Sequence, residues 1–368
     1  MWAYPMGGVN TGVWKAFMGH RLQCFQRLGL GTLLLSSIGL CFAQKEPQPT
    51  RIWSVGPLTK GAPVMGISLG SGVATVTGPH VNSQTGSIFA ATRSVVFAGD
   101  RIVLASMVGM MPKQDYQLLS LDIKTGEIKG SRELVGFGVR AIFSTNDAHV
   151  IVSGSSILRL TPDLKDDGSF DYKTSGHRFV NVQNISPDGS TLGSKTSPGY
   201  DLIDATTLKA TQLTASPAVD TSVSSKGFVT NNPYSYTDVT GLHSIDQSKC
   251  GGRPQFLTDA LILETGCKSP IVVDTRGNII KALPIKGDFA YAGVSQNGKR
   301  FALQAGSFSG EHTLKQEHFV IYSVGTWEPI TELTPDVPGE EQSWTAFSPD
   351  GSLFVVGSPL KLTLYRLP

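Results

Sequence analysis

The chain has 368 residues, of which 40% are hydrophobic and 16% are charged, with 41 glycines and 21 prolines. So much apolar material can build a large core, and the low charge with many glycines and prolines favours strands joined by turns over a helical bundle. The formal net charge is only +2, so the composition argues against electrostatic capture of nucleic acid or of an anionic membrane.

The first predicted element is a secretion signal. Three basic residues precede an uncharged run over residues 28–43, which is shorter than the ~20 residues that a membrane-spanning helix needs. Small side chains at Cys41 and Ala43 fit cleavage by signal peptidase before Gln44. We therefore expect a signal peptide over residues 1–43, a periplasmic or secreted protein, and no stable membrane insertion after cleavage. An uncleaved anchor is the alternative.

Cleavage would leave a mature chain of nearly balanced charge. It would remove three of the 31 Lys and Arg residues and none of the 29 Asp and Glu residues, which leaves 28 basic residues against 29 acidic ones. The signal is complete from Met18 onward, so Met1 and Met18 are both candidate starts of translation.

The segment after the signal, residues 44–50, is polar, holds two prolines and is interpreted as a linker. The remaining chain, residues 51–368, repeats a unit of strand, tight turn and strand, most clearly in residues 185–190, 294–302 and 347–356. The turns recur at a mean spacing of about 42 residues. They are centred on Asp100, Asp147, Asp188, a degenerate copy at Lys226 and Gly227, Asp259, Asn297 and Asp350.

Apolar outer strands follow the turns, and several of them end at a second turn that contains Asp and Gly. They are predicted over residues 117–123, 201–205, 271–275, 318–324 and 362–366. Each repeat then holds two strands around the tight turn, one outer strand, and a fourth strand at the edge after the second turn. Seven such blocks of four strands, repeated around an axis, predict an all-β, seven-bladed β-propeller. A count of eight stays open, because residues 61–91 could hold extra strands.

The two ends of the predicted domain explain how the ring would close. Residues 51–55 form an early strand with no hairpin partner beside it, and the chain ends on an outer strand over residues 361–367. An open ring would leave unpaired strand edges. We therefore expect the early strand to complete the last blade.

The Ser-Pro-Asp-Gly turns followed by an apolar strand resemble those of the WD-repeat-like propellers, including the bacterial periplasmic members of the Tol type. The resemblance covers residues 51–368 as architecture and is close only in the three copies named above. The Gly-His and Trp-Asp signatures of true WD repeats are missing. The resemblance implies a propeller scaffold, and a scaffold does not specify an activity.

Two cysteines, Cys250 and Cys267, remain after cleavage and lie 17 positions apart. In an oxidising compartment we expect this pair to form a disulfide. The alternative, a redox or metal pair, lacks the CxxC spacing and has no neighbouring histidine.

Other motifs favour no metal and no cofactor. The Asp residues of the turns are spread around the ring, whereas calcium needs six or more oxygen ligands around one point. Residues 121–127 resemble one repeat of the quinoprotein dehydrogenases, but no docking tryptophan follows. His312 and His318 are interpreted as part of a polar loop insertion, and Ser68 sits in a G-x-S-x-G pattern without the strand, turn and helix that a hydrolase needs.

One set of residues is better motivated as a binding site. When the inner strands are aligned on the apolar residue before each turn, five copies carry a large polar or aromatic side chain three positions earlier. These residues are Arg93, Arg140, Arg253, Tyr291 and Trp344. In a propeller they would surround one mouth of the central channel, where Arg and aromatic rings suit an anionic small molecule, a sugar or a peptide segment. The alternative is that they only solvate the mouth, and a slip of one residue would turn a side chain to the other face.

The leading functional hypothesis is an exported, monomeric protein that recognises a small molecule, a sugar, a peptide or a protein partner at the channel mouth. The first alternative is an enzyme of the lactonase, lyase or glycosidase kind with its site at the same face. Binding is preferred because the five aligned residues include no carboxylate and no imidazole. The second alternative is a subunit of an envelope assembly, with contacts made by side loops such as residues 307–316.

Overall fold

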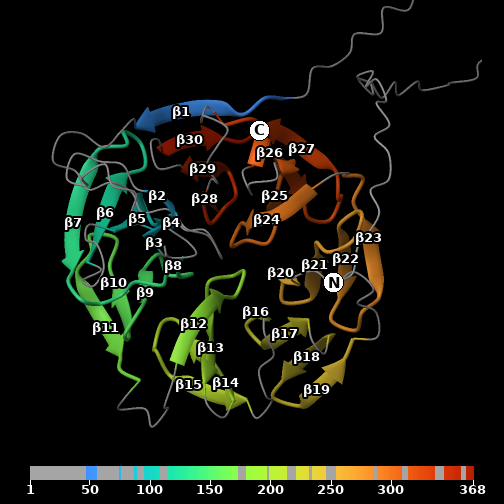
Figure 1. The fold of residues 1–368 in the computed structure, drawn as a ribbon, viewed down its shortest axis with the longest axis horizontal. Helices are drawn as coiled ribbons and strands as arrows, with labels where there is room; N and C mark the ends of the chain where they lie inside the picture. Colours follow the sequence, from blue (N-terminus) through green and yellow to red (C-terminus); the bar gives the residue numbers. More distant parts are fainter. Residues whose placement is uncertain are drawn as a thin grey trace, which may run out of the picture. The chain divides into compact units, whose positions relative to one another are not determined.

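The computed structural model describes residues 47–55, 74–75, 87–88, 95–107, 115–172, 180–196, 199–213, 221–231, 234–245, 254–285, 288–308, 314–335, 344–357 and 362–368. Residues 47–368 belong to one compact unit, in which seven antiparallel sheets of four strands surround a central axis (Figure 1). The seven-bladed propeller is therefore confirmed. The described residues contain strands and turns and no helix, so none of their segments is a helix that could span a membrane.

Each blade runs in chain order from an inner strand beside the axis to an outer edge strand. Blades 1 to 3 consist of β4 (Val95–Ala98), β5 (Arg101–Met107), β6 (Tyr116–Asp122) and β7 (Ile128–Leu134); β8 (Ala141–Ser144), β9 (Val150–Ser153), β10 (Ile157–Leu160) and β11 (Asp166–Phe170); and β12 (Val180–Ile185), β13 (Thr191–Thr196), β14 (Tyr200–Asp204) and β15 (Ala210–Leu213). Blades 4 to 6 consist of β16 (Thr221–Val223), β17 (Gly227–Asn231), β18 (Tyr234–Asp238) and β19 (Gly241–Ser244); β20 (Gln255–Thr258), β21 (Leu261–Glu264), β22 (Ile271–Asp274) and β23 (Ile279–Ala282); and β24 (Asp288–Val294), β25 (Arg300–Phe308), β26 (Leu314–Ser323) and β27 (Pro329–Leu333).

Blade 7 closes the ring with strands from both ends of the domain. It contains β28 (Trp344–Phe347), β29 (Leu353–Gly357) and β30 (Leu362–Arg366), and its outer strand is β1 (Thr50–Val55). β1 pairs antiparallel with β30, from Thr50 opposite Arg366 to Val55 opposite Leu362. The predicted closure is confirmed. Two short strands in the region that could have held an eighth blade, β2 (Ala74–Thr75) and β3 (Ser87–Ile88), form a separate two-stranded sheet.

Both faces of each blade are buried, which explains the continuous apolar runs in the sequence. Seven clusters of buried apolar side chains lie among the described residues, one between each pair of neighbouring blades. In β4, Val95 and Phe97 face blade 7, whereas Val96 and Ala98 face blade 2, as the alternation of side chains along a strand requires. Each fully buried large apolar side chain contributes about 1.5–3 kcal/mol to folding, so the blade interfaces supply most of the stability.

The two ends of the channel differ in how the strands are connected. We call the end that carries the turns between first and second strands the turn face, and the opposite end the loop face. At the turn face the Ser348 hydroxyl donates to the Asp350 carboxylate at 2.6 Å, and Gly351 has φ of 75°. Asp350 is therefore used inside its own turn. Ser186 and Asp188 repeat the arrangement.

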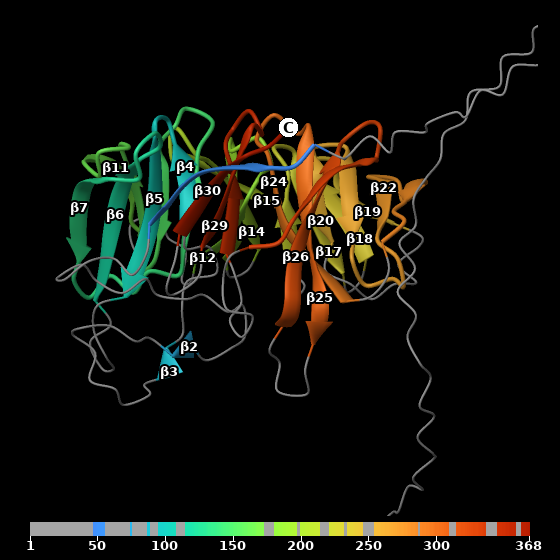
Figure 2. The ribbon, with the colours of Figure 1, turned by 90° about the horizontal axis from the view of Figure 1, so that it is seen from above.

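One predicted loop is part of a hairpin. The sequence predicts that the insertion over residues 307–316 is a side loop, but Ser307 pairs with Lys315 and Phe308 pairs with Leu314. β25 and β26 are thus longer than the other strands of the ring, and their hairpin projects from the loop face (Figure 2). His312 lies outside the described residues.

Candidate functional site

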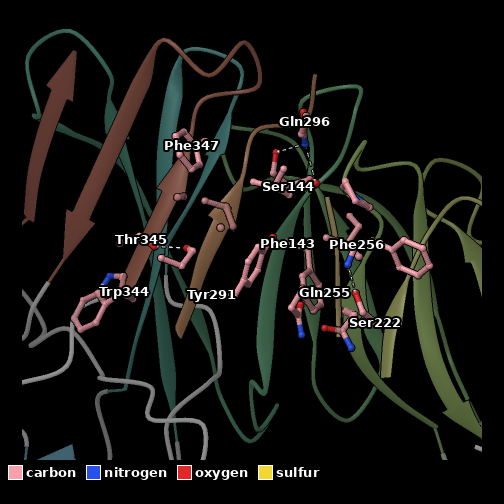
Figure 3. A pocket seen from close by; sticks show the side chains of 18 of the residues that line it. Phe143, Ser144, Ser222, Gln255, Phe256, Tyr291, Gln296, Trp344, Thr345 and Phe347 are labelled. Atoms are coloured by element: carbon pink, nitrogen blue, oxygen red, sulfur yellow. Dashed lines mark hydrogen bonds between the residues drawn. The ribbon is translucent and has the colours of Figure 1, made fainter. Parts of the chain in front are cut away.

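A cavity of about 490 Å³ lies at the centre of the ring and is lined by residues of all seven inner strands (Figure 3). Its size falls within the ~300–1,000 Å³ that sites for small molecules span. Because each blade supplies its first strand to the lining, the site depends on the closed ring and not on one local motif.

The described lining is polar and aromatic but carries no charged side chain and no histidine. Four amide side chains contribute, from Asn184, Gln255, Gln296 and Gln304. Hydroxyl groups come from residues such as Ser144, Ser222, Thr265 and Thr345. Aromatic rings come from residues such as Phe143, Phe256, Phe289, Tyr291, Trp344 and Phe347. Amides and hydroxyls both donate and accept hydrogen bonds, so this surface suits an uncharged polar ligand.

Gln296 crosses the channel at the turn face. It lies in the turn after β24 of blade 6, and its Nε2 donates to the Ser144 carbonyl at 3.1 Å, to the Ser144 hydroxyl at 3.2 Å and to the Thr145 carbonyl at 3.3 Å on blade 2 (Figure 3). Gly189 of blade 3 lies close to the same nitrogen, which would be 2.7 Å from a Cβ at that position. The Gln296 side chain thus joins blade 6 to blade 2 by hydrogen bonds and lies against blade 3, at the turn-face end of the channel.

A β-bulge shapes the blade 6 wall. The pairing of β24 with β25 shifts between Tyr291 and Gly293, and Gly293 has φ of 148°. The Thr345 hydroxyl of blade 7 donates to the Ala292 carbonyl inside this bulge (Figure 3). Bulges redirect side chains, and this one is held in place by the neighbouring blade. The position of Tyr291 in the lining therefore depends on a contact that is distant in sequence.

The structure brings together two of the five predicted site residues. Tyr291 and Trp344 both line the cavity, on the neighbouring blades 6 and 7. Arg140 is exposed just before β8 and is not among the lining residues. Arg93 and Arg253 lie outside the described residues. A role of these residues in binding stays a prediction.

Trp344 contributes to the core as well as to the cavity. Only 7% of it is exposed, and it packs between blades 7 and 1 against Val95 and Val355. Its indole lies against the backbone of Gly357, where any Cβ would collide with it. Its Nε1 is buried, and no described residue is its hydrogen-bond partner. Replacement of Trp344 would therefore disturb folding, so this residue is unsuitable for a binding test.

Two buried carboxylates lie next to lining residues without belonging to the lining. Glu317 accepts a hydrogen bond from the lining residue Gln304 and is 6% exposed. Glu264 precedes the lining residue Thr265 and is 3% exposed. Burial raises the pKa of Glu264, and burial together with the neighbouring Glu264 raises the pKa of Tyr234 on blade 4.

Two further predictions concern metals and the disulfide. The described residues contain no group of three or more His, Cys, Asp or Glu side chains that could hold a metal ion. Cys267 is half-buried in the connection after β21, and Cys250 lies outside the described residues. The disulfide stays a prediction. Ser68 also lies outside the described residues.

The amides of the lining were not predicted from the sequence, although one of them carries a signal there. Gln296 stands where Pro187 and Pro349 stand in the other clear copies of the turn. A large polar side chain in place of proline, in an otherwise repeated turn, indicates a residue with a contact of its own. Gln255 and Gln304 carry no comparable signal, because their orientation depends on the register of the blades.

Comparison of the chain with protein-family models and with curated proteins found no match.

Proposed function

We propose that the chain is an exported β-propeller that binds its ligand in the central cavity. The observation that carries the proposal is the cavity itself, a space of about 490 Å³ to which every blade contributes its inner strand. The propeller is a scaffold for binding or for catalysis, and the chemistry of the lining favours binding. Export rests on the signal sequence, and the Ser-Pro-Asp-Gly turns support kinship with the WD-repeat-like propellers of the Tol type.

The lining chemistry distinguishes binding from hydrolysis. Amide and hydroxyl groups position a ligand but do not act by themselves as general acids or bases near neutral pH. Lactonases, lyases and glycosidases need carboxylates, imidazoles or a metal at the reacting bond. Burial raises the pKa of the Glu264 carboxyl, but Glu264 is not among the residues that line the cavity. The enzyme alternative would need groups from the undescribed residues.

The test is a search for ligands by thermal shift, with sugars, dipeptides and small organic anions as probes. A compound that raises the melting temperature is then titrated by calorimetry against Gln255→Ala and against the control Gln212→Ala, which changes an exposed amide on the outer strand β15. We expect at least a tenfold loss of affinity in Gln255→Ala and none in the control. Unchanged affinity in both variants would exclude the cavity as the binding site.

A second candidate function is that of a subunit in an envelope assembly. The observation that favours it is the projecting β25–β26 hairpin, whose strands pair out to Phe308 and Leu314. Replacement of residues 307–315 by a short Gly-Ser link should release the chain from its native complex, measured by sedimentation, and leave ligand binding intact. Loss of binding with the complex preserved would argue for a role of the hairpin in the site instead.

A further inference from the structure

We infer that the ligand is a neutral mono- or disaccharide that enters the cavity from the loop face. This inference rests on the proposed function, because it specifies the ligand of the same cavity. Three observations carry it: the absence of charge in the described lining, an uncommitted amide beside aromatic rings, and the Gln296 contact at the turn face.

The lining argues against a charged ligand. An ion that leaves water for an enclosed site must be paired or hydrogen-bonded there, or its desolvation costs several kcal/mol. The described lining offers no Lys, Arg, His, Asp or Glu as a partner. A sugar hydroxyl is neutral and both donates and accepts, which is the hydrogen-bonding character of the amides and hydroxyls that are present.

Gln255 is the amide that is available to such a ligand. Gln296 is held by Ser144 and Thr145, and Gln304 is held by Glu317. Asn184 also has an interaction within the protein. In contrast, no described residue is a hydrogen-bond partner of the Gln255 side chain, which is half-buried on β20 and lies toward the loop face (Figure 3).

Aromatic rings supply the second part of a saccharide site. A pyranose ring has polar edges and a face of C–H groups, so it fits a wall that combines hydrogen-bonding groups with aromatic surface. Tyr291 is half-buried in the cavity wall, and Phe289 lies two residues earlier on the same strand. The bulge at Gly293, held by Thr345, fixes this wall before a ligand arrives, which reduces the entropy lost on binding.

The direction of entry follows from Gln296. Its three hydrogen bonds to blade 2 cross the channel at the turn face. A ligand that entered there would have to break them. Gln255 and Tyr291 lie nearer to the other end of the channel (Figure 3).

The experiment compares sugars that differ in charge. The purified mature protein is titrated by calorimetry with the common neutral hexoses and their disaccharides, with glucuronic acid and glucosamine as charged counterparts, and with neutral tripeptides. We expect at least one neutral sugar to bind and its charged counterpart to bind at least about tenfold more weakly. Gln255→Ala and Tyr291→Ala should each weaken that binding at least about tenfold, and Gln212→Ala should not change it.

The other outcomes separate the saccharide from the cavity. A charged sugar or a tripeptide that binds more tightly than any neutral sugar, with sensitivity to Gln255→Ala, would overturn the saccharide and preserve the cavity as the binding site. Binding that none of the cavity variants affects, or no binding by any probe, would overturn the saccharide inference. If a probe binds but none of the cavity variants weakens its binding, the proposed function is overturned as well.

Entry is tested by the rate of exchange. Gln296→Ala removes the contact at the turn face, so we expect ligand dissociation in stopped-flow measurements to become several times faster. An unchanged dissociation rate would show that the turn face is not the closed end.

Discussion

Gly189 shows how much a single position in a repeated turn can be constrained. It has φ of 76°, and a Cβ there would lie 2.8 Å from the Asn146 nitrogen and 2.7 Å from the Gln296 amide. Gly136 has a similar φ of 65°, but a Cβ there would meet nothing within 4 Å. The first glycine is therefore needed for both conformation and space, and the second for conformation alone.

We expect Gly136→Ala to lower the free energy of unfolding by about 1–2 kcal/mol, the cost of a left-handed backbone for a residue with a side chain. Gly189→Ala should cost at least about 2 kcal/mol more, because the backbone of blade 2 must also move. Urea denaturation of the two variants measures the difference. Equal decreases in the free energy of unfolding would show that the close approach at Gly189 does not contribute to stability.

Asp147 in blade 2 illustrates a residue whose charge is stabilised by folding. Burial raises the pKa of its carboxyl, but hydrogen bonds from Arg159 and Thr145 and the positive charge of Arg159 outweigh this effect and lower the pKa to about 2. Arg159 is 4% exposed and contacts the Asp147 carboxylate at 2.6 Å and the Asp167 carboxylate at 2.7 Å. The ion pair therefore belongs to the structure of the turn face and not to the cavity.

The pH dependence follows from the sign of this shift. The folded-state pKa lies below the ordinary value of 3.8, so the stabilisation is complete above pH 4 and is lost as the pH falls toward 2. Because the carboxylate is 35% exposed, solvent screening reduces the effect to about 1 kcal/mol.

Asp147→Asn should be less stable than the wild type at pH 7, and this difference should shrink at pH 2.5. Asp166→Asn, which removes an exposed pair with Arg132, should have little effect at either pH. A deficit of Asp147→Asn that stays constant with pH would contradict the assignment.

At the scale of elements, the sequence predicted what depends on local pattern and missed what depends on register. The tight turns and the strands around them follow from turn residues and apolar runs that lie close together in the chain. The closing strand follows from the unpaired edges that an open ring would leave. The place of Arg140 outside the cavity does not follow from such a pattern, and Tyr291, which does line the cavity, is positioned there by a bulge. Alignment by counting back three residues places both in one ring, but β8 begins only after Arg140, and a bulge shifts the register next to Tyr291. The bulge depends on the register of β24 against β25 and on the contact from Thr345 of blade 7, which no local pattern records.

β1 is the element whose removal tests the ring. Trp53 donates from Nε1 to the Ile123 carbonyl of blade 1 at 2.9 Å, so this strand joins blade 7 to blade 1 as well as pairing with β30. A chain that starts at residue 56 loses the two half-buried side chains of Ile52 and Trp53, which together are worth about 3 kcal/mol, and exposes the edge of β30.

We expect this truncated chain to melt several degrees lower than a chain that starts at residue 44, and to aggregate. Addition of a synthetic peptide of residues 47–55 should restore part of the stability, because it can pair with β30. Equal melting temperatures of the two chains, measured by calorimetry, would show that ring closure contributes little.

At the scale of the whole molecule, the predicted processing and the observed ring constrain each other. The Thr331 hydroxyl of blade 6 donates to the Pro47 carbonyl at 3.1 Å, and β1 begins three residues later. Cleavage before Gln44 would therefore leave the closing strand complete, with three residues ahead of its first contact. Cleavage beyond Thr50 would remove part of that strand and open the ring.

Intact mass spectrometry of the exported protein tests this relation together with the predicted disulfide. We expect a chain that begins at Gln44 and is two hydrogens lighter than its reduced form, because Cys250 and Cys267 would be the two cysteines left after cleavage. Alkylation without reductant should leave both cysteines unmodified, and alkylation after reduction should modify both.

A disulfide that spans 17 positions would restrict the unfolded chain and stabilise the fold by about 3 kcal/mol, so reduction should lower the melting temperature by several degrees. A mature chain that begins inside β1 would mean that the ring closes in another way, and two reactive thiols in the exported protein would refute the disulfide alone.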